Sequence, residues 1–147
     1  MTTKVISVTE NETIKNLFKI FDKNGILGVP VVNDKNEVTG IITESDLIKH
    51  FTTLEAPNSI NLLGGIVYLE NIGDFNKHLK EHCAETVKDM AFNTAVTVDE
   101  DKTLLDVINI MADEKITRLP VVNADNKLTG IITRTDVVHQ IAKMTKI

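Results

Sequence analysis

The alternation of apolar and polar positions divides the chain into two stretches of the same design, separated by a segment that does not repeat. Residues 5–51 align with residues 95–141 at a constant offset of 90, and 16 of the 47 aligned positions are identical. The identities cluster in Pro30–Asn33 and Thr39–Thr43 and in their counterparts in the second copy. A gapless repeat of this length predicts a duplicated structural unit.

Each copy is predicted to contain one short strand and a pair of longer strands. The short alternating segments are residues 5–8 and 96–98. Two β-branched runs joined by a four-residue polar turn predict a β-hairpin later in each copy. These runs span residues 29–32 and 38–43 in the first copy, and 119–122 and 128–133 in the second.

Two helices complete each copy, which therefore reads β-α-β-β-α. The first helix has apolar residues at the i, i+3, i+4, i+7 spacing of one buried face. They are Ile14, Leu17, Phe18 and Phe21, and Leu104, Val107, Ile108 and Met111. Thr9 with Glu12 has capping-box spacing and Asp99 is a good N-cap, so we expect the first helices to begin there. The last helix is expected after Thr43 or Thr133.

The segment between the copies, residues 52–94, is longer than a plain linker. Apolar residues at Ile72, Phe75, Leu79 and Cys83 predict an extra helix there. One copy alone is marginal in stability, so the two are expected to pack about a pseudo-twofold axis. We predict an α/β fold of two tandem β-α-β-β-α units with a helical insert. The expected boundaries are 1–53 for the first unit, 54–90 for the insert and 91–147 for the second unit.

Composition narrows the classes of function. The net charge of −5 disfavours a nucleic-acid partner. A single cysteine, Cys83, excludes an internal disulfide and suits the reducing cytoplasm. The N-terminus has no basic and apolar signal stretch, and the most apolar segment, Ile60–Leu69, is too short to span a membrane. These features predict a cytoplasmic domain with no membrane partner.

The repeated motif resembles the cystathionine-β-synthase (CBS) domain family. Gly40–Asp46 and Gly130–Asp136 both match the family's Gly-h-h-Ser/Thr-x-x-Asp signature, each after a Pro-Val-Val-Asn strand. The resemblance covers most of the chain apart from the insert. It implies a non-catalytic regulatory pair of CBS units that binds an adenine nucleotide such as AMP or ATP between the units. It also implies a homodimer that regulates a partner protein or an attached domain.

The first copy departs from the family at its start. Val87–Met90 precedes the second copy as the family usually shows, whereas the counterpart of Met90 would fall before Met1. The chain therefore either begins there or is a piece cut from a longer protein.

The chemistry of the motif suits a nucleotide. A threonine lies where a strand meets a helix, so free backbone N–H groups and the helix dipole favour phosphate. An aspartate one turn later can accept hydrogen bonds from ribose hydroxyls, and an isoleucine can hold adenine. The candidates are Ile41, Thr43, Ser45 and Asp46, and Ile131, Thr133, Thr135 and Asp136. The same threonine–aspartate spacing is also that of an ordinary capping box, which is the alternative.

Flanking residues predict that the two sites differ. Arg118 stands just before the Pro-Val-Val strand of the second copy, where the first copy has Gly28. Arg134 lies within the second motif, where the first motif has Glu44. Two guanidinium groups suit phosphate, and the alternative is that both are solvated surface charges. We expect a charged nucleotide at the Asp136 motif, and no ligand or a less anionic adenosyl group at the other.

By resemblance, each cleft also borrows residues from the opposite unit. Thr94, Ile116 and Thr117 would face the Asp46 motif, and Lys4, Ile26 and Leu27 the Asp136 motif.

His78–His82 spells the metalloprotease pattern H-x-x-E-H, and histidines at i, i+4 on a helix can share a metal. Leu79 and Cys83 are expected to be the buried positions of that helix, away from any cleft. We therefore assign no metal and no catalytic residue. Two alternatives remain, namely a structural dimerisation module with degenerate clefts and an enzyme that uses His78 and His82 on a metal.

Overall fold

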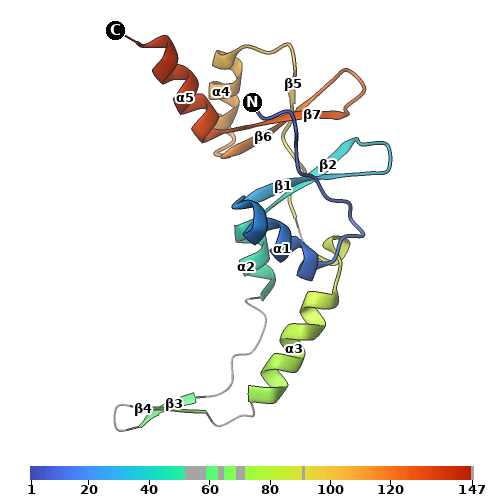
Figure 1. Ribbon diagram of the computed structural model, residues 1–147, viewed down its shortest axis with the longest axis vertical. Helices are drawn as coiled ribbons and strands as arrows, with labels where there is room; N and C mark the ends of the chain where they lie inside the picture. The colour runs from blue at the N-terminus through green and yellow to red at the C-terminus, as the bar shows by residue number, and fades with distance from the viewer. Residues whose placement is uncertain (52–58, 63–64, 69–71, 91, 147) are drawn as a thin grey trace. The chain divides into compact units, whose positions relative to one another are not determined.

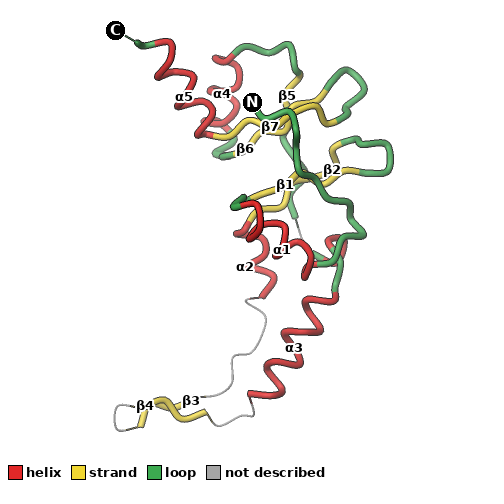
Figure 2. The backbone as a smooth tube through the Cα atoms, viewed as in Figure 1, coloured by secondary structure: helices red, strands yellow, loops and turns green. Residues whose placement is uncertain are grey.

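The computed structural model describes residues 1–51, 59–62, 65–68, 72–90 and 92–146 (Figures 1 and 2). The elements are α1 (Ile14–Asn24), β1 (Gly28–Val32), β2 (Val38–Thr43), α2 (Glu44–Phe51), β3 (Ser59–Leu62), β4 (Gly65–Tyr68), α3 (Ile72–Ala84), the 3₁₀ helix η1 (Val87–Asp89), β5 (Val98–Asp99), α4 (Leu104–Asp113), β6 (Arg118–Val122), β7 (Leu128–Thr133) and α5 (Arg134–Met144). The predicted α/β class with a repeated β-α-β-β-α order is confirmed.

The short parallel strand expected at the start of each copy is present in the second copy, and a single parallel bridge takes its place in the first. In the second copy β5 pairs in parallel with β6, with Val98 opposite Val121. Val8 makes the equivalent bridge to Val31 in the first copy. All five residues of β1 are buried, which explains its continuous apolar sequence.

The two hairpins β1–β2 and β6–β7 turn at the same asparagines. Asn33 Oδ1 accepts the backbone N–H groups of Lys35 and Glu37, both at 3.0 Å, and Asn36 has φ 62°. Asn123 and Asn126 repeat this arrangement in the second copy. Asparagine forms such local hydrogen bonds and tolerates left-handed backbone, so the turn explains why these residues recur.

The first helix of each copy begins one turn later than predicted. The N-caps are Thr13 and Thr103, whose hydroxyls each accept the backbone N–H three residues on at 3.2 Å. The predicted caps at Thr9 and Asp99 are therefore wrong. In the second copy Asp106 returns a carboxylate to the Thr103 N–H at 2.9 Å, which completes a capping box. Thr13 and Thr103 are aligned in the two copies, and this identity was the sequence signal for the true N-cap.

The predicted buried faces are largely present. α1 buries Ile14, Leu17 and Phe21, whereas Phe18 is 40% exposed and its ring lies 5.5 Å from that of Phe51. α4 contributes its buried residues to one cluster with the second sheet, which comprises Val98, Val107, Met111, Leu119 and Val121.

The insert contains the expected helix and an unexpected hairpin. α3 covers the predicted stripe, but Leu79 is 37% exposed, so its prediction as a buried position is wrong. β3 and β4 pair antiparallel, with Ser59 opposite Tyr68. The sequence signal for this hairpin was the diglycine Gly64-Gly65, which has apolar residues on both sides. No helix in the described part of the chain is long and apolar enough to cross a membrane.

The chain divides into two compact units whose boundaries cross the sequence copies. The first compact unit comprises Met1–Thr9, Gly28–Ile42 and Phe92–Ile147, and so holds both hairpins. The second compact unit comprises Glu10–Leu27 and Thr43–Ala91. The three domain boundaries expected from the repeat stay a prediction.

Reciprocal hydrogen bonds join the two hairpins inside the first compact unit. Val38 N–H donates to Asn126 O at 3.3 Å, and Leu128 N–H donates to Asn36 O at 3.0 Å. The residues of each bond are the counterparts of those in the other. This part of the molecule is therefore arranged about a local pseudo-twofold relation.

Candidate functional site

The last strand of each copy is flanked by the chain that leads into the other copy. Thr2 and Ile131 exchange two backbone hydrogen bonds of 3.0 Å, and Ile41 N–H donates to Asn93 O at 3.3 Å. Each signature motif therefore begins beside a segment from the opposite copy.

The signature glycines make this approach possible. A Cβ on Gly40 would collide with the ring of Phe92. A Cβ on Gly130 would lie 2.7 Å from Met1 Sδ and 3.2 Å from Thr2 O. A side chain at Gly40 would displace the Phe92 ring, and one at Gly130 would press on Met1 and the Thr2 carbonyl, which favours glycine at both positions.

The threonine and aspartate of each motif form the same cap. Asp136 Oδ2 accepts the Thr133 N–H at 2.8 Å and its hydroxyl at 3.0 Å, and Thr133 Oγ1 accepts the Asp136 N–H at 3.3 Å. Asp46 Oδ2 accepts the equivalent bonds from Thr43 at 2.8 and 3.0 Å. Both aspartates therefore do form helix caps, as the alternative interpretation predicted. In the described contacts only Oδ2 of each aspartate takes part in the cap.

A hollow of about 270 Å³ opens beside Asp136 in the first compact unit. Its lining includes Met1, Leu104, Ile132, Asp136, Val137, His139, Gln140 and Lys143. Three of these lie three, four and seven residues after Asp136 on α5. Sequence reasoning missed them, although that helical spacing was a signal for one shared face.

Arg118 lies over Gly28, its counterpart in the first copy. A Cβ on Gly28 would be 2.8 Å from Arg118 Cδ and 3.0 Å from its Nε. The guanidinium donates from Nη1 to the Thr117 hydroxyl at 3.0 Å. The arginine stem thus fills the space that the glycine leaves.

The residues after the motif threonines have different surroundings. Arg134 lines a second hollow, of about 310 Å³, with Ile108, Met111 and Val138 among others. It lies two positions from Asp136, and helical residues at that spacing do not face each other. In the first copy, one carboxylate oxygen of Glu44 is buried without a hydrogen-bond partner in the described part of the chain.

The predicted site residues fall in both compact units. The first unit holds Lys4, Ile41, Thr94, Ile116, Thr117, Arg118, Ile131, Thr133, Arg134, Thr135 and Asp136, and the second holds Ile26, Leu27, Thr43, Ser45 and Asp46. Leu27 O accepts the N–H of Glu44, the first residue of α2, at 3.1 Å. Thr117 O accepts the N–H of Arg134, the first residue of α5, at the same distance. The residues expected to be borrowed from the opposite copy stay a prediction.

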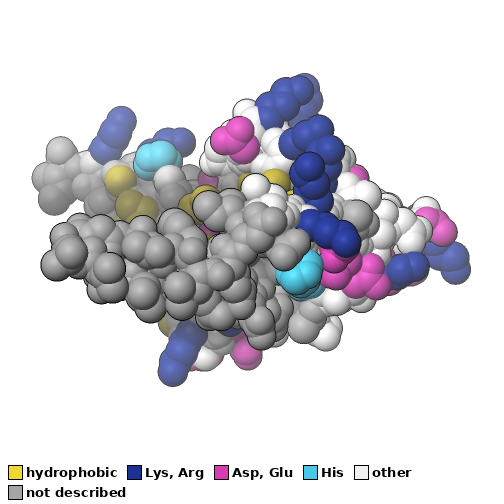
Figure 3. Space-filling model, turned by 90° about the horizontal axis from the view of Figure 1, so that it is seen from below, with side chains coloured by type: hydrophobic (Ala, Val, Ile, Leu, Met, Phe, Trp, Pro, Cys, Tyr) yellow, Lys and Arg dark blue, Asp and Glu magenta, His cyan; other side chains and the backbone are white. Residues whose placement is uncertain are grey.

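The H-x-x-E-H pattern lies on α3, where the two histidine rings do not face each other as a pair. His82 Nδ1 lies 3.0 Å from the backbone carbonyl of His78, one turn earlier. Cys83 is half-buried and lines a hollow with Lys15, Leu79 and Lys80. Figure 3 shows histidine side chains at the surface of the molecule, one of them beside acidic and basic side chains.

Comparison with known proteins identifies the repeat. A family model described as the CBS domain matches residues 1–53 and 87–143. An uncharacterised protein of Methanocaldococcus jannaschii is 31% identical over 143 residues, which cover 92% of this chain and 85% of that protein.

Two solved structures share the fold. The AMP complex of CBSX2, a chloroplastic CBS domain-containing protein of Arabidopsis thaliana, is 22% identical with a TM-score of 0.72, over 99% of this chain and 95% of that one. The CBS domain pair of protein MJ0100, in complex with 5′-methylthioadenosine and S-adenosyl-L-methionine, is 22% identical with a TM-score of 0.68, over 95% and 93%.

Proposed function

The chain belongs to the CBS domain family, and from that premise we propose that it is a regulatory module that senses an adenine nucleotide or an adenosyl ligand. The observation that carries the proposal is the hollow beside Asp136. Its volume of about 270 Å³ is near the lower limit of small-molecule pockets, which suits the nucleoside part of such a ligand.

The Asp136 motif is the proposed site for AMP or ATP. The cap holds Asp136 by Oδ2, which leaves Oδ1 to accept hydrogen bonds from the ribose hydroxyls. The N-terminus of α5, with Thr133 and Thr135, favours a phosphate group. Arg118 and Lys4 are the proposed cations for that phosphate, and Ile131 would contact the base.

The Asp46 motif is proposed to take a less anionic adenosyl ligand or to stay empty. Glu44 stands where the second motif has Arg134, and its buried carboxylate oxygen lacks a partner in the described part of the chain. A phosphate beside that carboxylate would be repelled. The ligands named for the two solved relatives, AMP in one and adenosyl compounds in the other, support both classes.

Regulation would follow from differential binding. A ligand shifts a conformational equilibrium only by the difference in its affinity for the two states. We propose that the module works as a homodimer in the cytoplasm and passes this shift to a partner protein or an attached domain, with no catalysis of its own.

A thermal-shift panel of adenine and guanine ligands tests the proposal. At a concentration 100 times Kd, a ligand that binds only the folded protein adds about 2.7 kcal/mol of stability. We expect AMP or ATP at millimolar concentration to raise Tm, and Asp136→Ala to abolish the rise. Asp106→Ala is the matched control because it removes the same kind of cap from α4.

A different result would support the alternative. If no adenine compound changes Tm in the unsubstituted protein, the clefts are degenerate and the module serves for dimerisation only.

A further inference from the structure

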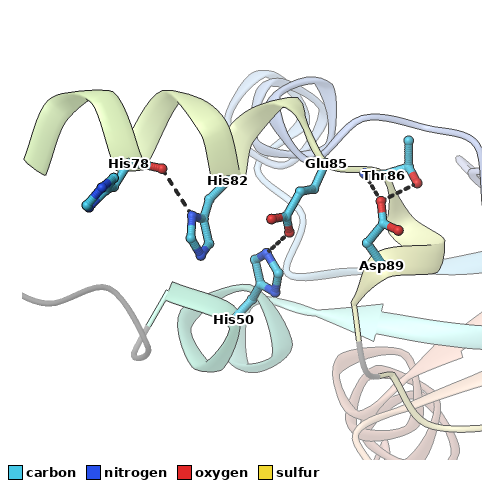
Figure 4. A network of polar contacts seen from close by, with 6 residues as sticks. All are labelled: His50, His78, His82, Glu85, Thr86 and Asp89. Atoms are coloured by element: carbon cyan, nitrogen blue, oxygen red, sulfur yellow. Dashed lines mark hydrogen bonds and ion pairs between the residues drawn. The ribbon is translucent and has the colours of Figure 1, made fainter. Parts of the chain in front are cut away.

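His50, His82 and Glu85 converge in the second compact unit (Figure 4). His50 lies in the last turn of α2, His82 on α3, and Glu85 directly after α3. One potential ligand atom from each lies within 4.8 Å of the other two. His50 Nε2 and Glu85 Oε2 are 2.8 Å apart. His82 and Glu85 are three residues apart, whereas His50 lies 32 residues before His82, so the fold has brought His50 to the other two.

The hydrogen bond of His82 fixes its tautomer. Because the His78 carbonyl only accepts, His82 Nδ1 must carry the proton in the 3.0 Å contact between them. The Nε2 lone pair then remains for another partner. Histidines that bind metals almost always donate their other ring N–H in this way, to a carbonyl or a carboxylate.

The backbone around Glu85 is held in place by the start of α1 and the residues just before it. Glu85 O accepts the Ile14 N–H at 2.9 Å, and Val87 N–H donates to Glu12 O at 2.8 Å. The Thr86 N–H and hydroxyl donate to Asp89 Oδ2 at 2.9 and 2.8 Å. A site supported by such a frame needs little rearrangement to bind an ion.

Burial is intermediate at this cluster. The side chains of His50 and Glu85 are 16% and 37% exposed. An ion can therefore reach them, while water competes less than at an open surface.

We propose that His50, His82 and Glu85 bind Zn²⁺ or a similar divalent transition metal, with water completing the coordination. Two imidazoles and a carboxylate are a set that zinc accepts. Bonds of about 2.0–2.2 Å to such ligands place neighbouring ligand atoms about 3.3–3.5 Å apart. On metal binding, the 2.8 Å distance between His50 Nε2 and Glu85 Oε2 would lengthen slightly. Any longer distance among the three ligand atoms, all of which lie within 4.8 Å of one another, would shorten.

Such an ion would join α2 to the insert. α2 begins directly after Thr43 and carries Asp46 in its first turn and His50 in its last. The metal therefore binds the same short helix as the proposed adenosyl motif. It fixes the position of that helix against α3.

Zinc titration of the full, tag-free chain by calorimetry tests the site. We expect one Zn²⁺ per chain, with affinity at least tenfold weaker in His50→Ala, His82→Ala and Glu85→Gln. His78→Ala is the matched control on α3, since only the backbone carbonyl of that residue takes part. It should bind zinc as the unsubstituted chain does.

Three results would overturn the proposal. These are no stoichiometric zinc binding by the unsubstituted chain, unchanged binding in His50→Ala, or loss in His78→Ala, which would point to the His78 and His82 rings. Circular dichroism identifies variants that fail to fold, and the visible spectrum of the Co²⁺-loaded chain reports nitrogen and oxygen ligation without any variant. Asp136→Ala should retain zinc, which separates this site from the proposed nucleotide site.

Discussion

Gly28 and Arg118 occupy the same position of the two sequence copies, and in the folded chain they lie against each other. The arginine stem covers the glycine, and a Cβ there would also lie 3.2 Å from the backbone oxygen of Ile42. Arg118 is flexible and Ile42 O is not, so an added methyl group would move the arginine first. If Arg118 contacts phosphate as proposed, Gly28 is a positioning residue for that contact.

Gly28→Ala is expected to weaken ATP binding about tenfold, or ~1.4 kcal/mol, while Tm changes little. The reason is displacement of the Arg118 guanidinium rather than damage to the core. Calorimetric titration of Gly28→Ala, Arg118→Ala and the double variant measures the coupling. In the Arg118→Ala background the glycine substitution should have no further effect, and independent losses would contradict this account.

At the scale of an element, the capping box of α4 links stability to pH. Hydrogen bonds from the Thr103 N–H and hydroxyl hold the pKa of Asp106 below its ordinary value. The Thr86 N–H and hydroxyl lower the pKa of Asp89 in the same way. A carboxyl group whose pKa is depressed in the folded state stabilises the fold above its unfolded value, near pH 4, and loses that effect as pH falls further.

Asp106→Asn should therefore lower Tm at pH 7 by a few degrees, and the difference from the unsubstituted chain should shrink below about pH 4. Thermal melts at pH 7, 5 and 3 measure this. Asp113→Asn changes the same charge at the other end of α4 and is the control. A difference that persists at pH 3 would show that the cap is not the source.

At the scale of the molecule, the apolar side chains of the last helix point to self-association. α5 buries none of its residues, and Val138, Ile141 and Met144 are 63%, 40% and 70% exposed. Leu105 on α4 is 64% exposed. Val138, Ile141 and Met144 recur every three residues along α5, and an exposed apolar helix face of this kind is typical of an interface, which is consistent with the proposed homodimer.

Val138→Asp combined with Met144→Asp is expected to give a monomer, since two carboxylates would have to be desolvated in the interface. Light scattering after size-exclusion chromatography gives the mass directly. Asn109→Asp, at an exposed polar position of α4, should leave the oligomeric state unchanged. An unsubstituted chain that is already monomeric would refute the homodimer.

The amino-acid sequence by itself determined the repeat, the β-α-β-β-α order and the hairpin boundaries. These depend on local periodicity, on asparagine turns and on glycine positions that recur in both copies. Helix starts were less certain because neighbouring polar residues compete as caps, and Thr13 rather than Thr9 is used.

Only the tertiary structure decided which side chains meet. The stem of Arg118 lies over Gly28, α5 places Lys143 in the hollow beside Asp136, and His50 lies beside His82 and Glu85. The members of these groups come from separate elements or from successive turns of a helix. No local pattern specifies such proximity, because it results from how the hydrophobic faces of those elements pack.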